Sequence, residues 1–134
     1  MGAAEAAGGA GHHFRVVQLP LNLGMPEILS NPNQRIENQM VSFLKAASRF
    51  GVLAMASGSI LQGQAARGLP PIVSEVFPGF ETDAQRAIQF TRSAPNVGVA
   101  LVGMRSDQHV RENMEVSKQF PASIEEFMKL FGKE

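Results

Sequence analysis

The chain has 134 residues, enough for one ordinary domain with a hydrophobic core. Its basic and acidic side chains balance at a formal net charge of zero, which argues against a nucleic-acid partner. Without cysteine, the chain has no disulfide, thiolate metal site or thiol nucleophile. It has no apolar run long enough for a membrane helix, and its first residues do not resemble a signal peptide. We therefore expect a cytoplasmic protein that does not bind membranes.

Residues 1–13 are predicted to form a flexible tail. They are mostly alanine and glycine, so they bury too little surface to offset the entropy lost on ordering. His12 and His13 close this segment, but no third ligand stands near them to complete a metal site. Residues 14–134 are predicted to form the domain.

Short apolar segments predict three strands, at residues 14–19, 52–56 and 97–102. The last segment is apolar throughout, which is typical of a strand covered on both faces. The sequence between residues 22 and 33 is expected to be irregular.

Each predicted strand is followed by a predicted helix. The first has apolar residues at helical spacing from Ile36 to Ala47, and the second begins at Thr82 and stops before Pro95. The third starts at Ser106 or Asp107 and runs to about residue 117. Residues 72–77 add one helical turn, and a capping box at residues 123–126 begins the last helix.

Alternating strands and helices predict the α/β class, with parallel strands joined by right-handed crossovers. Three strands alone would expose two unpaired edges and leave one face of an apolar sheet uncovered. The chain is therefore expected either to associate with copies of itself or to be a piece of a larger α/β domain.

Ligands of α/β proteins bind at the carboxyl ends of the strands, which here are followed by residues 18–22, 57–62 and 103–109. Gln18 is either a buried amide or a ligand-binding group. The small residues 57–59 fit an ordinary turn or the close approach of a ligand. Arg105, Ser106 and Asp107 could bind a phosphate, or the last two could simply cap the helix.

The helix that follows brings further polar residues to this third segment. Asn113 lies four residues after His109, so both are on one helical face. Glu112 could form a salt bridge with Arg105 or face water.

Three segments resemble aldo/keto reductases, in the order in which that family has them. Residues 99–113 (VALVGMRSDQHVREN) resemble the family's last strand and the helix that begins His-x-x-Glu-Asn. Residues 59–64 (SILQGQ) are similar to the segment after its seventh strand, and residues 16–22 (VVQLPLN) to its sixth strand. The resemblance implies three parallel βα units, strands 6 to 8, of a (β/α)8 TIM barrel.

The resemblance also implies a nicotinamide-cofactor site. Gln18 would bond the nicotinamide amide, Met55 takes the place of an aromatic residue that stacks on that ring, and the last strand and helix would hold the adenosine and its 2′-phosphate. The cofactor-binding residues implied in this way are Gln18, Met55, Ala56, Ser57, Gly58, Ser59, Leu61, Gln62, Gly103, Met104, Arg105, Ser106, His109, Glu112 and Asn113. Gln64 replaces the family's lysine and His109 an arginine, so the cofactor is NADP(H) by resemblance, with NAD(H) possible.

The family's catalytic Asp, Tyr, Lys and His come from the first half of its barrel, so no catalytic residue is expected in this chain. Consistently, the sequence contains no tyrosine at all. We therefore expect the NADP(H)-binding portion of an oxidoreductase that is inactive alone, and whose partner is the missing amino-terminal barrel half or a second copy. The alternative is a non-catalytic nucleotide-binding or self-associating interaction module. No metal site is expected.

Overall fold

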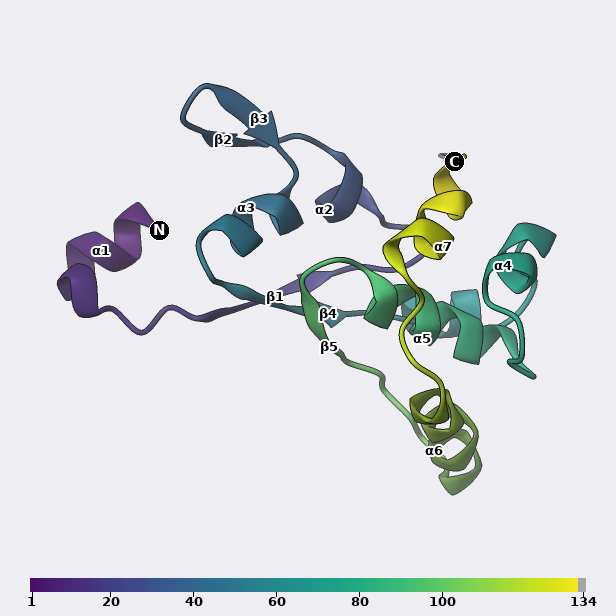
Figure 1. The fold of residues 1–134 in the computed structure, drawn as a ribbon. Coiled ribbons are helices and arrows are strands. Elements are labelled where there is room, and N and C mark those ends of the chain that lie inside the picture. Colours follow the sequence, from purple (N-terminus) through teal and green to yellow (C-terminus); the bar gives the residue numbers. More distant parts are fainter. Residues whose placement is uncertain (133–134) are drawn as a thin grey trace.

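The computed structural model describes residues 1–132, and a parallel three-stranded sheet lies near its centre (Figure 1). The strands are ordered β1–β4–β5, with bounds Val16–Pro20, Leu53–Ser57 and Val97–Ala100. All three predicted strands are confirmed, although β5 ends two residues before its predicted limit. The outer edges of β1 and β5 have no neighbouring strand within residues 1–132. The chain is therefore of the α/β class, with an open sheet.

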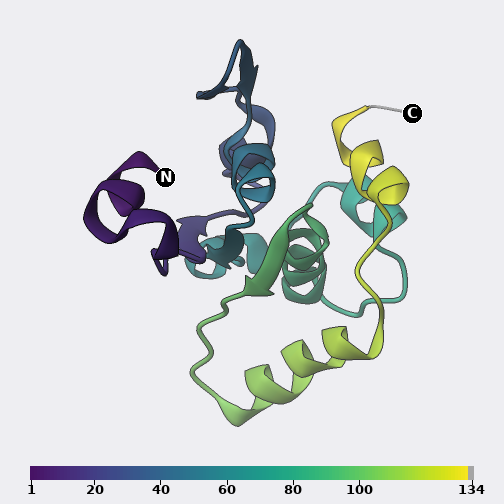
Figure 2. The same cartoon turned by 60° about the vertical axis from the view of Figure 1, so that its left-hand side comes forward.

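A helix follows each strand of this sheet. These helices are α3 (Phe43–Arg49), α5 (Asp83–Ser93) and α6 (Asp107–Met114), and a 3-10 turn, η3 (Glu115–Lys118), prolongs α6. In α5 the predicted cap is confirmed, because Thr82 Oγ1 accepts a hydrogen bond from the backbone of Gln85, whose own side chain accepts one from Thr82 N. The chain thus forms three βα units, and α6 lies below the sheet in Figure 2, joined to β5 by an extended segment.

The hydrophobic core lies on one face of the sheet. Ala54 and Ala56 of β4 are buried there together with Leu44 of α3 and Ile88 and Phe90 of α5. These helices supply the apolar side chains that cover this face. Small alanines on the strand allow the helices to pack closely against it.

The carboxy-terminal helix α7 (Ile124–Met128) completes this core. Its predicted capping box is confirmed by hydrogen bonds between Ser123 and Glu126. Phe127 is fully buried and stacks on Phe90 with a centroid distance of 5.1 Å, and Phe131 of the following turn η4 (Lys129–Phe131) packs against both rings. The end of the described chain is therefore an integral part of the core.

Within residues 1–132, no helix packs on the opposite face of the sheet. Val16, Leu53, Val99 and Leu101, which we call the open face, expose between 36% and 45% of their surface. Val16 stands beside Leu53 in the parallel register, so the two side chains share this face. The prediction that the third strand is covered on both faces is therefore wrong for this chain, because nothing within residues 1–132 covers the side that bears Val99.

An irregularity in β5 decides which of its residues reach the open face. Ala54 pairs with Val97, but the next residue, Met55, pairs with Val99, so Gly98 is an extra residue in β5. A Cβ atom on Gly98 would lie 2.6 Å from the side chain of Leu53. Glycine is therefore the residue that fits this bulge.

The first predicted helix is wrong over its first half. Residues 34–41 form an antiparallel hairpin, β2 (Gln34–Ile36) with β3 (Gln39–Val41), which projects from the top of the view in Figure 1. Its turn places Glu37 at φ 53°, a left-handed conformation that interrupts a right-handed α-helix. The helix begins only at Phe43, where Ser42 Oγ accepts a hydrogen bond from Lys45 N. Ile36 and Met40 therefore have helical spacing in the sequence but lie in a hairpin.

Short helical segments occupy several of the connections. Within the stretch predicted to be irregular lies α2 (Glu27–Ser30), and α4 (Pro71–Val76) confirms the predicted helical turn. The segment η2 (Leu61–Ala66) follows β4. The amino-terminal residues form α1 (Gly2–Gly8) and η1 (Gly9–Gly11), which bury no residue, so the flexibility of residues 1–13 stays a prediction. No helix within residues 1–132 is both long and apolar enough to cross a membrane.

Candidate functional site

The carboxyl ends of the three strands meet along one side of the sheet, which we call the carboxyl edge. Pro20 at the end of β1 pairs with Ser57 at the end of β4, and Ala56 pairs with Ala100 at the end of β5. The three predicted site segments therefore start from adjacent points, although they are far apart in the sequence. Parallel strands produce this convergence because all of them end on the same side.

Gln18 and Met55 stand side by side within the sheet, near this edge. They are partners in the register of β1 and β4, and Met55 in turn pairs with Val99 of β5. Gln18 is exposed and Met55 is half-buried. The alternative in which Gln18 is a buried amide is therefore wrong for this chain, and its polar group is accessible on the side of the open face.

The loop after β4 is fixed by side chains of the neighbouring segments. Ser59 is 1% exposed, and its hydroxyl donates a hydrogen bond to the carbonyl of Leu101 at 2.9 Å. Gly58 adopts φ 68°, a left-handed conformation that suits glycine. Ser59 thus serves to tie this loop to the end of β5, a role that turn-forming propensity alone did not indicate.

Asn22 is a buried polar residue of this edge that the sequence did not single out. It is fully buried, its Nδ2 donates to the carbonyl of Gly58 at 3.0 Å, and its Oδ1 accepts from the N–H of Gly24 at 3.0 Å. Thr91 of α5, also fully buried, donates to the carbonyl of Leu21. The position of Asn22 two residues beyond an apolar strand was the available signal, but burial is needed to interpret it.

In the loop after β4, two residues beyond Ser59, the backbone has unusual conformations. Leu61 has φ 47° and Gln62 has φ 53°, so two consecutive non-glycine residues are left-handed, and Gly63 follows at φ 90°. Each such residue costs about 1–2 kcal/mol relative to an ordinary conformation. Strain of this kind gathers at functional sites, where the surrounding structure maintains it.

The third segment leads from β5 into α6. Ser106 Oγ accepts a hydrogen bond from His109 N at 3.2 Å, so the capping role proposed for Ser106 is confirmed. Gly103, Arg105 and His109 are exposed, whereas Met104 is half-buried. The cationic and polar groups of this segment are therefore accessible from water.

Helix α6 is anchored to α5 through its backbone. Gln85 Nε2 donates to the carbonyl of Glu112 at 2.7 Å, and the side chain of Glu112 accepts from Gln108 Nε2 at 2.6 Å. Glu112 therefore pairs with Gln108, and no ion pair joins it to Arg105 within the described residues. Asn113 is half-buried. No hydrogen bond or ion pair of residues 1–132 joins α6 to the loop after β4, so the structure does not bring those two groups together directly.

The fold, unlike the sequence as a whole, matches known proteins. No family model matches the sequence, and no curated protein does. The structure of aldo-keto reductase AKR11C1 from Bacillus halodurans matches at a TM-score of 0.62 and 15% identity in its holo form, covering 91% of this chain and 43% of that one. Its apo form gives the same TM-score, identity and coverage of this chain, with 44% of that one covered.

A second aldo-keto reductase, the thermostable Tm1743 in complex with the inhibitor epalrestat, matches at a TM-score of 0.60 and 19% identity, covering 96% of this chain and 43% of that one. The fold is that of part of an aldo-keto reductase barrel. The chain spans less than half the length of the aldo-keto reductase structures that it matches.

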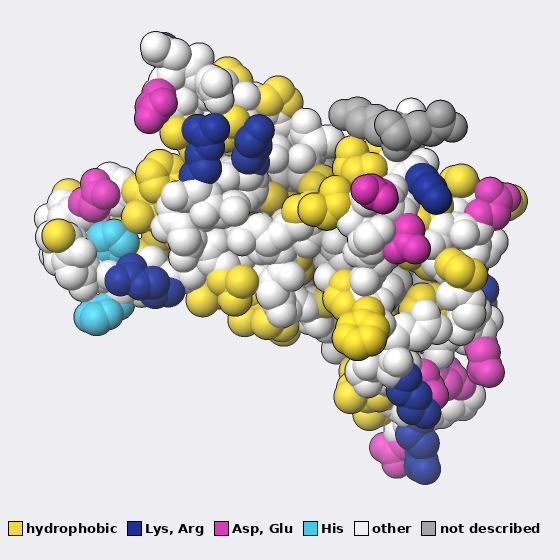
Figure 3. Space-filling view, viewed as in Figure 1, with side chains coloured by type: hydrophobic (Ala, Val, Ile, Leu, Met, Phe, Trp, Pro, Cys, Tyr) yellow, Lys and Arg dark blue, Asp and Glu magenta, His cyan; other side chains and the backbone are white. Residues whose placement is uncertain are grey.

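This match gives the open face a place in the fold. In a (β/α)8 barrel the helices surround the strands, and the side chains on the opposite face fill the interior. The open face, which bears Val16 and Leu53, lies opposite the helices and therefore corresponds to the barrel interior. Hydrophobic side chains gather along the lower margin of the molecule in Figure 3. Within residues 1–132, the sheet face that corresponds to the interior of such a barrel is therefore partly exposed to solvent.

A hollow of about 460 Å³ lies beside the free edge of β5. Two predicted site residues of the aldo-keto reductase resemblance, Met104 and Asn113, are among its lining residues, together with Arg92 and Met114. Arg92 donates to the carbonyls of Val116 and Gln119, and burial lowers the pKa of its guanidinium from the ordinary value. Arg92 nevertheless stays positively charged, as arginine does in proteins.

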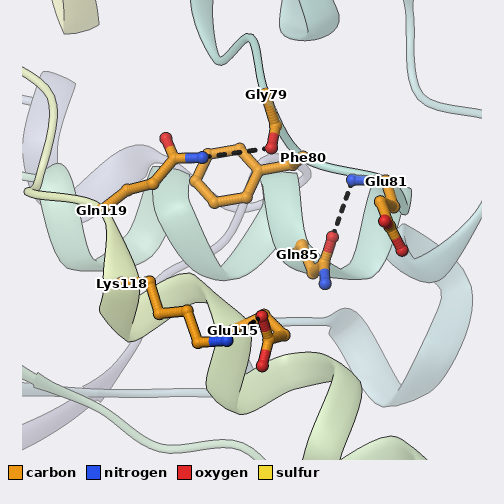
Figure 4. A pocket seen from close by; sticks show the side chains of 7 residues that line it. All are labelled: Gly79, Phe80, Glu81, Gln85, Glu115, Lys118 and Gln119. Atoms are coloured by element: carbon orange, nitrogen blue, oxygen red, sulfur yellow. Dashed lines mark hydrogen bonds and ion pairs between the residues drawn. The ribbon is translucent and has the colours of Figure 1, made fainter.

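A second hollow, of about 290 Å³, lies away from the predicted site, between the start of α5 and η3 (Figure 4). The polar groups around it bind each other: Gln119 donates to the carbonyl of Gly79, Gln85 accepts from the N–H of Glu81, and Lys118 pairs with Glu115. These polar groups therefore have partners within the chain and do not require a ligand. Among residues 1–132 no three or more His, Asp or Glu side chains are grouped to hold a metal ion.

Proposed function

We propose that this chain is the carboxy-terminal, NADP(H)-binding portion of an aldo-keto reductase, with a barrel segment at residues 14–134 behind a flexible tail at residues 1–13. The convergence of three segments at the carboxyl edge carries the proposal. They follow β1, β4 and β5 in the order of the family resemblance, and the fold matches aldo-keto reductase structures. The proposed contacts are the fifteen residues that the resemblance implies, from Gln18 to Asn113.

The geometry suits an extended dinucleotide. Gln18 and Met55 offer an amide and an apolar surface beside one another for the nicotinamide ring. The N–H groups of Ser59 and Ile60 donate to no group within the described residues, and because Ile60 is half-buried whereas Ser59 is 1% exposed, it is the N–H of Ile60 that could meet a phosphate oxygen. Arg105 and His109 are exposed near the start of α6, where a 2′-phosphate would be attracted.

Catalysis requires more than these residues provide. The cofactor supplies the hydride, but the carbonyl oxygen of a substrate must receive a proton as negative charge develops on it. The sequence has no tyrosine, and the family's proton donor lies in its first half. We therefore propose that the chain alone binds cofactor and does not reduce carbonyl compounds.

The proposed partner is the amino-terminal part of the barrel. The chain spans less than half of the matched structures, the outer edges of β1 and β5 are unpaired within the described residues, and the open face is apolar. Five further βα units would complete an eight-stranded barrel, pair both edges and fill the interior. Cofactor binding and turnover would then occur together in the completed barrel.

A titration with NADPH and NADH, followed through the fluorescence of the reduced nicotinamide, tests the cofactor proposal. We expect saturable binding of NADPH that Arg105→Ala weakens about tenfold, because a charge-assisted hydrogen bond of this kind contributes about 1.5–3 kcal/mol. Arg111→Ala is the matched control, since Arg111 is exposed on α6 but is not a proposed contact. Absence of NADPH binding, or an equal effect of both variants, would contradict the proposal.

A second candidate is a self-associating interaction module. The exposure of Val16, Leu53, Val99 and Leu101 favours it, because an apolar sheet face with two free edges is stabilised by any partner that covers it, including a second copy. Light scattering after size exclusion distinguishes the two candidates. A stable dimer that does not bind NADPH supports the module, whereas a monomer that binds NADPH supports the barrel portion.

A further inference from the structure

Asn22 occupies a position at the carboxyl edge that the proposed cofactor contacts do not include. We propose that Asn22 is a positioning residue, which holds the loop after β4 in the conformation that receives the cofactor's pyrophosphate. This inference rests on the proposed function. It adds a residue that would touch no part of the cofactor and would act through Gly58.

Both ends of the Asn22 amide are used in this arrangement. The side chain is fully buried, donates to the carbonyl of Gly58 and accepts from the N–H of Gly24, each at 3.0 Å. A buried amide is costly unless its groups are paired, so the two hydrogen bonds keep this side chain in one orientation. Asn22 therefore links the end of β1 to the loop after β4 at a fixed point.

The hydrogen bond to Gly58 also orients the next N–H group. The carbonyl of Gly58 and the N–H of Ser59 belong to one trans peptide unit, so they point in opposite directions. Because the carbonyl points to Asn22, the N–H of Ser59 points away from it. The same carbonyl accepts from Leu61 N at 2.8 Å, which closes the turn around Ile60. Asn22 thus holds the turn in which Ser59 is buried and Ile60, whose N–H has no partner within the described residues, is half-buried.

The backbone that carries Asn22 is itself anchored. The single hydroxyl proton of Thr91 is shared between the carbonyls of Ala87, at 3.2 Å, and Leu21, at 3.3 Å, and the N–H of Leu21 donates to the carbonyl of Ser57 at 3.1 Å. Both Leu21 and Thr91 are fully buried. Asn22 therefore acts from a rigid support in the sheet and α5, as a positioning residue requires.

A comparable bond at the other end of the sheet provides a matched control. Asn96 Nδ2 donates to the carbonyl of Val52 at 3.1 Å, and these residues precede β5 and β4. This bond is also a side-chain amide bound to a backbone carbonyl, but it lies far from the carboxyl edge along the strands. Asn96 has φ 62°, so Asn96→Gly removes the bond without adding backbone strain.

The experiment compares Asn22→Ala with Asn96→Gly, using two probes on the folded chain. NADPH contains the pyrophosphate, and adenosine 2′-monophosphate contains the adenosine and 2′-phosphate without it. We expect Asn22→Ala to weaken NADPH binding at least about tenfold and to leave adenosine 2′-monophosphate binding within about twofold of the unsubstituted chain. Asn96→Gly should change neither affinity by more than about twofold, although both variants lower the urea midpoint.

Each result has a separate meaning. If the unsubstituted chain binds NADPH but Asn22→Ala binds it equally well, the positioning role is wrong and the proposed function stands. A parallel loss of affinity for both probes would also overturn the role, because it would mark a general loss of structure. If the unsubstituted chain binds neither probe, the proposed function is wrong, and the positioning role, which rests on it, is wrong as well. Should Asn22→Ala not fold, Asn22→Ser applies the same test, since its shorter side chain cannot reach Gly58.

Discussion

Leu53 allows the open face to be tested by a single substitution. It is 41% exposed, and its neighbour Ala54 is 1% exposed on the opposite face of the same strand. Leu53→Lys and Ala54→Lys therefore place the same charged side chain at adjacent positions, one on the open face and one in the core. A lysine at position 53 can lay its carbon chain over Gly98 and keep its ammonium group in water.

The expected magnitudes differ widely. In the chain alone, Leu53→Lys should change the free energy of unfolding by less than about 1 kcal/mol, as surface substitutions do. Ala54→Lys buries an unpaired charge and overfills a packed site, and should cost more than about 4 kcal/mol or prevent folding. If the rest of the barrel is added, Leu53→Lys is expected to become destabilising. A partner would bury the exposed part of the leucine, worth about 1 kcal/mol, and would enclose the lysine charge at a cost of several more.

Urea unfolding followed by circular dichroism measures the first pair of effects, and light scattering gives the association state of each variant. A large destabilisation of the chain by Leu53→Lys, comparable with that of Ala54→Lys, would refute the reasoning, because the face would then be covered. If the unsubstituted chain is a dimer that Leu53→Lys converts to monomer, the cover is a second copy of the chain.

Two further predictions concern the carboxy-terminal helix. Phe127→Ala should lower the free energy of unfolding by about 3–5 kcal/mol, because the ring is fully buried against Phe90, and a urea titration that showed less than about 1 kcal/mol would mean that α7 does not pack on α5. The pKa of Glu126 is lowered mainly by hydrogen bonds from Ser123, so its contribution to stability is present at neutral pH and is lost as the pH falls through that lowered pKa. Glu126→Gln keeps the capping geometry without the charge, so its urea midpoint should fall less between neutral and acidic pH than that of the unsubstituted chain, and an equal fall would contradict the assignment.

Local signals in the sequence predicted the helix starts well. The caps at Thr82, Ser106 and Ser123 are all confirmed, because each is a bond between a side chain and a backbone N–H three residues further on. Such a bond depends little on the rest of the fold. The prediction of the first helix was wrong because it depended on spacing alone. The spacing of Ile36 and Met40 fits both a helix and a hairpin, and only the turn at Glu37 decides between them.

Burial was the part of the candidate site that the sequence could not provide. Gln18 and Asn22 are amides four residues apart near the end of β1, yet Gln18 is exposed on the side of the open face and Asn22 is fully buried. Strand alternation would place residues four apart on the same face, so their difference arises because β1 ends at Pro20 and the loop after β4 covers Asn22. Ser59 likewise fits a turn by composition, but its bond to Leu101 spans 42 positions of sequence. Long-range contacts of this kind leave no local pattern.

The extra residue at Gly98 determines to which face of the sheet the later residues of β5 point. Up to Val97 the strand follows one alternation, and after the bulge it follows the opposite one, so that Val99 and Leu101 face away from the helices while Val102 packs toward the core. If Gly98 paired as an ordinary strand residue, the two sets would exchange, which would direct the branched side chains of Val99 and Leu101 into the core and Ala100 out of it. A single unpaired residue therefore determines which of two incompatible surfaces β5 presents, and deletion of Gly98 itself would keep Val97 and Val99 on their present faces, because it removes only the residue without a partner on β4.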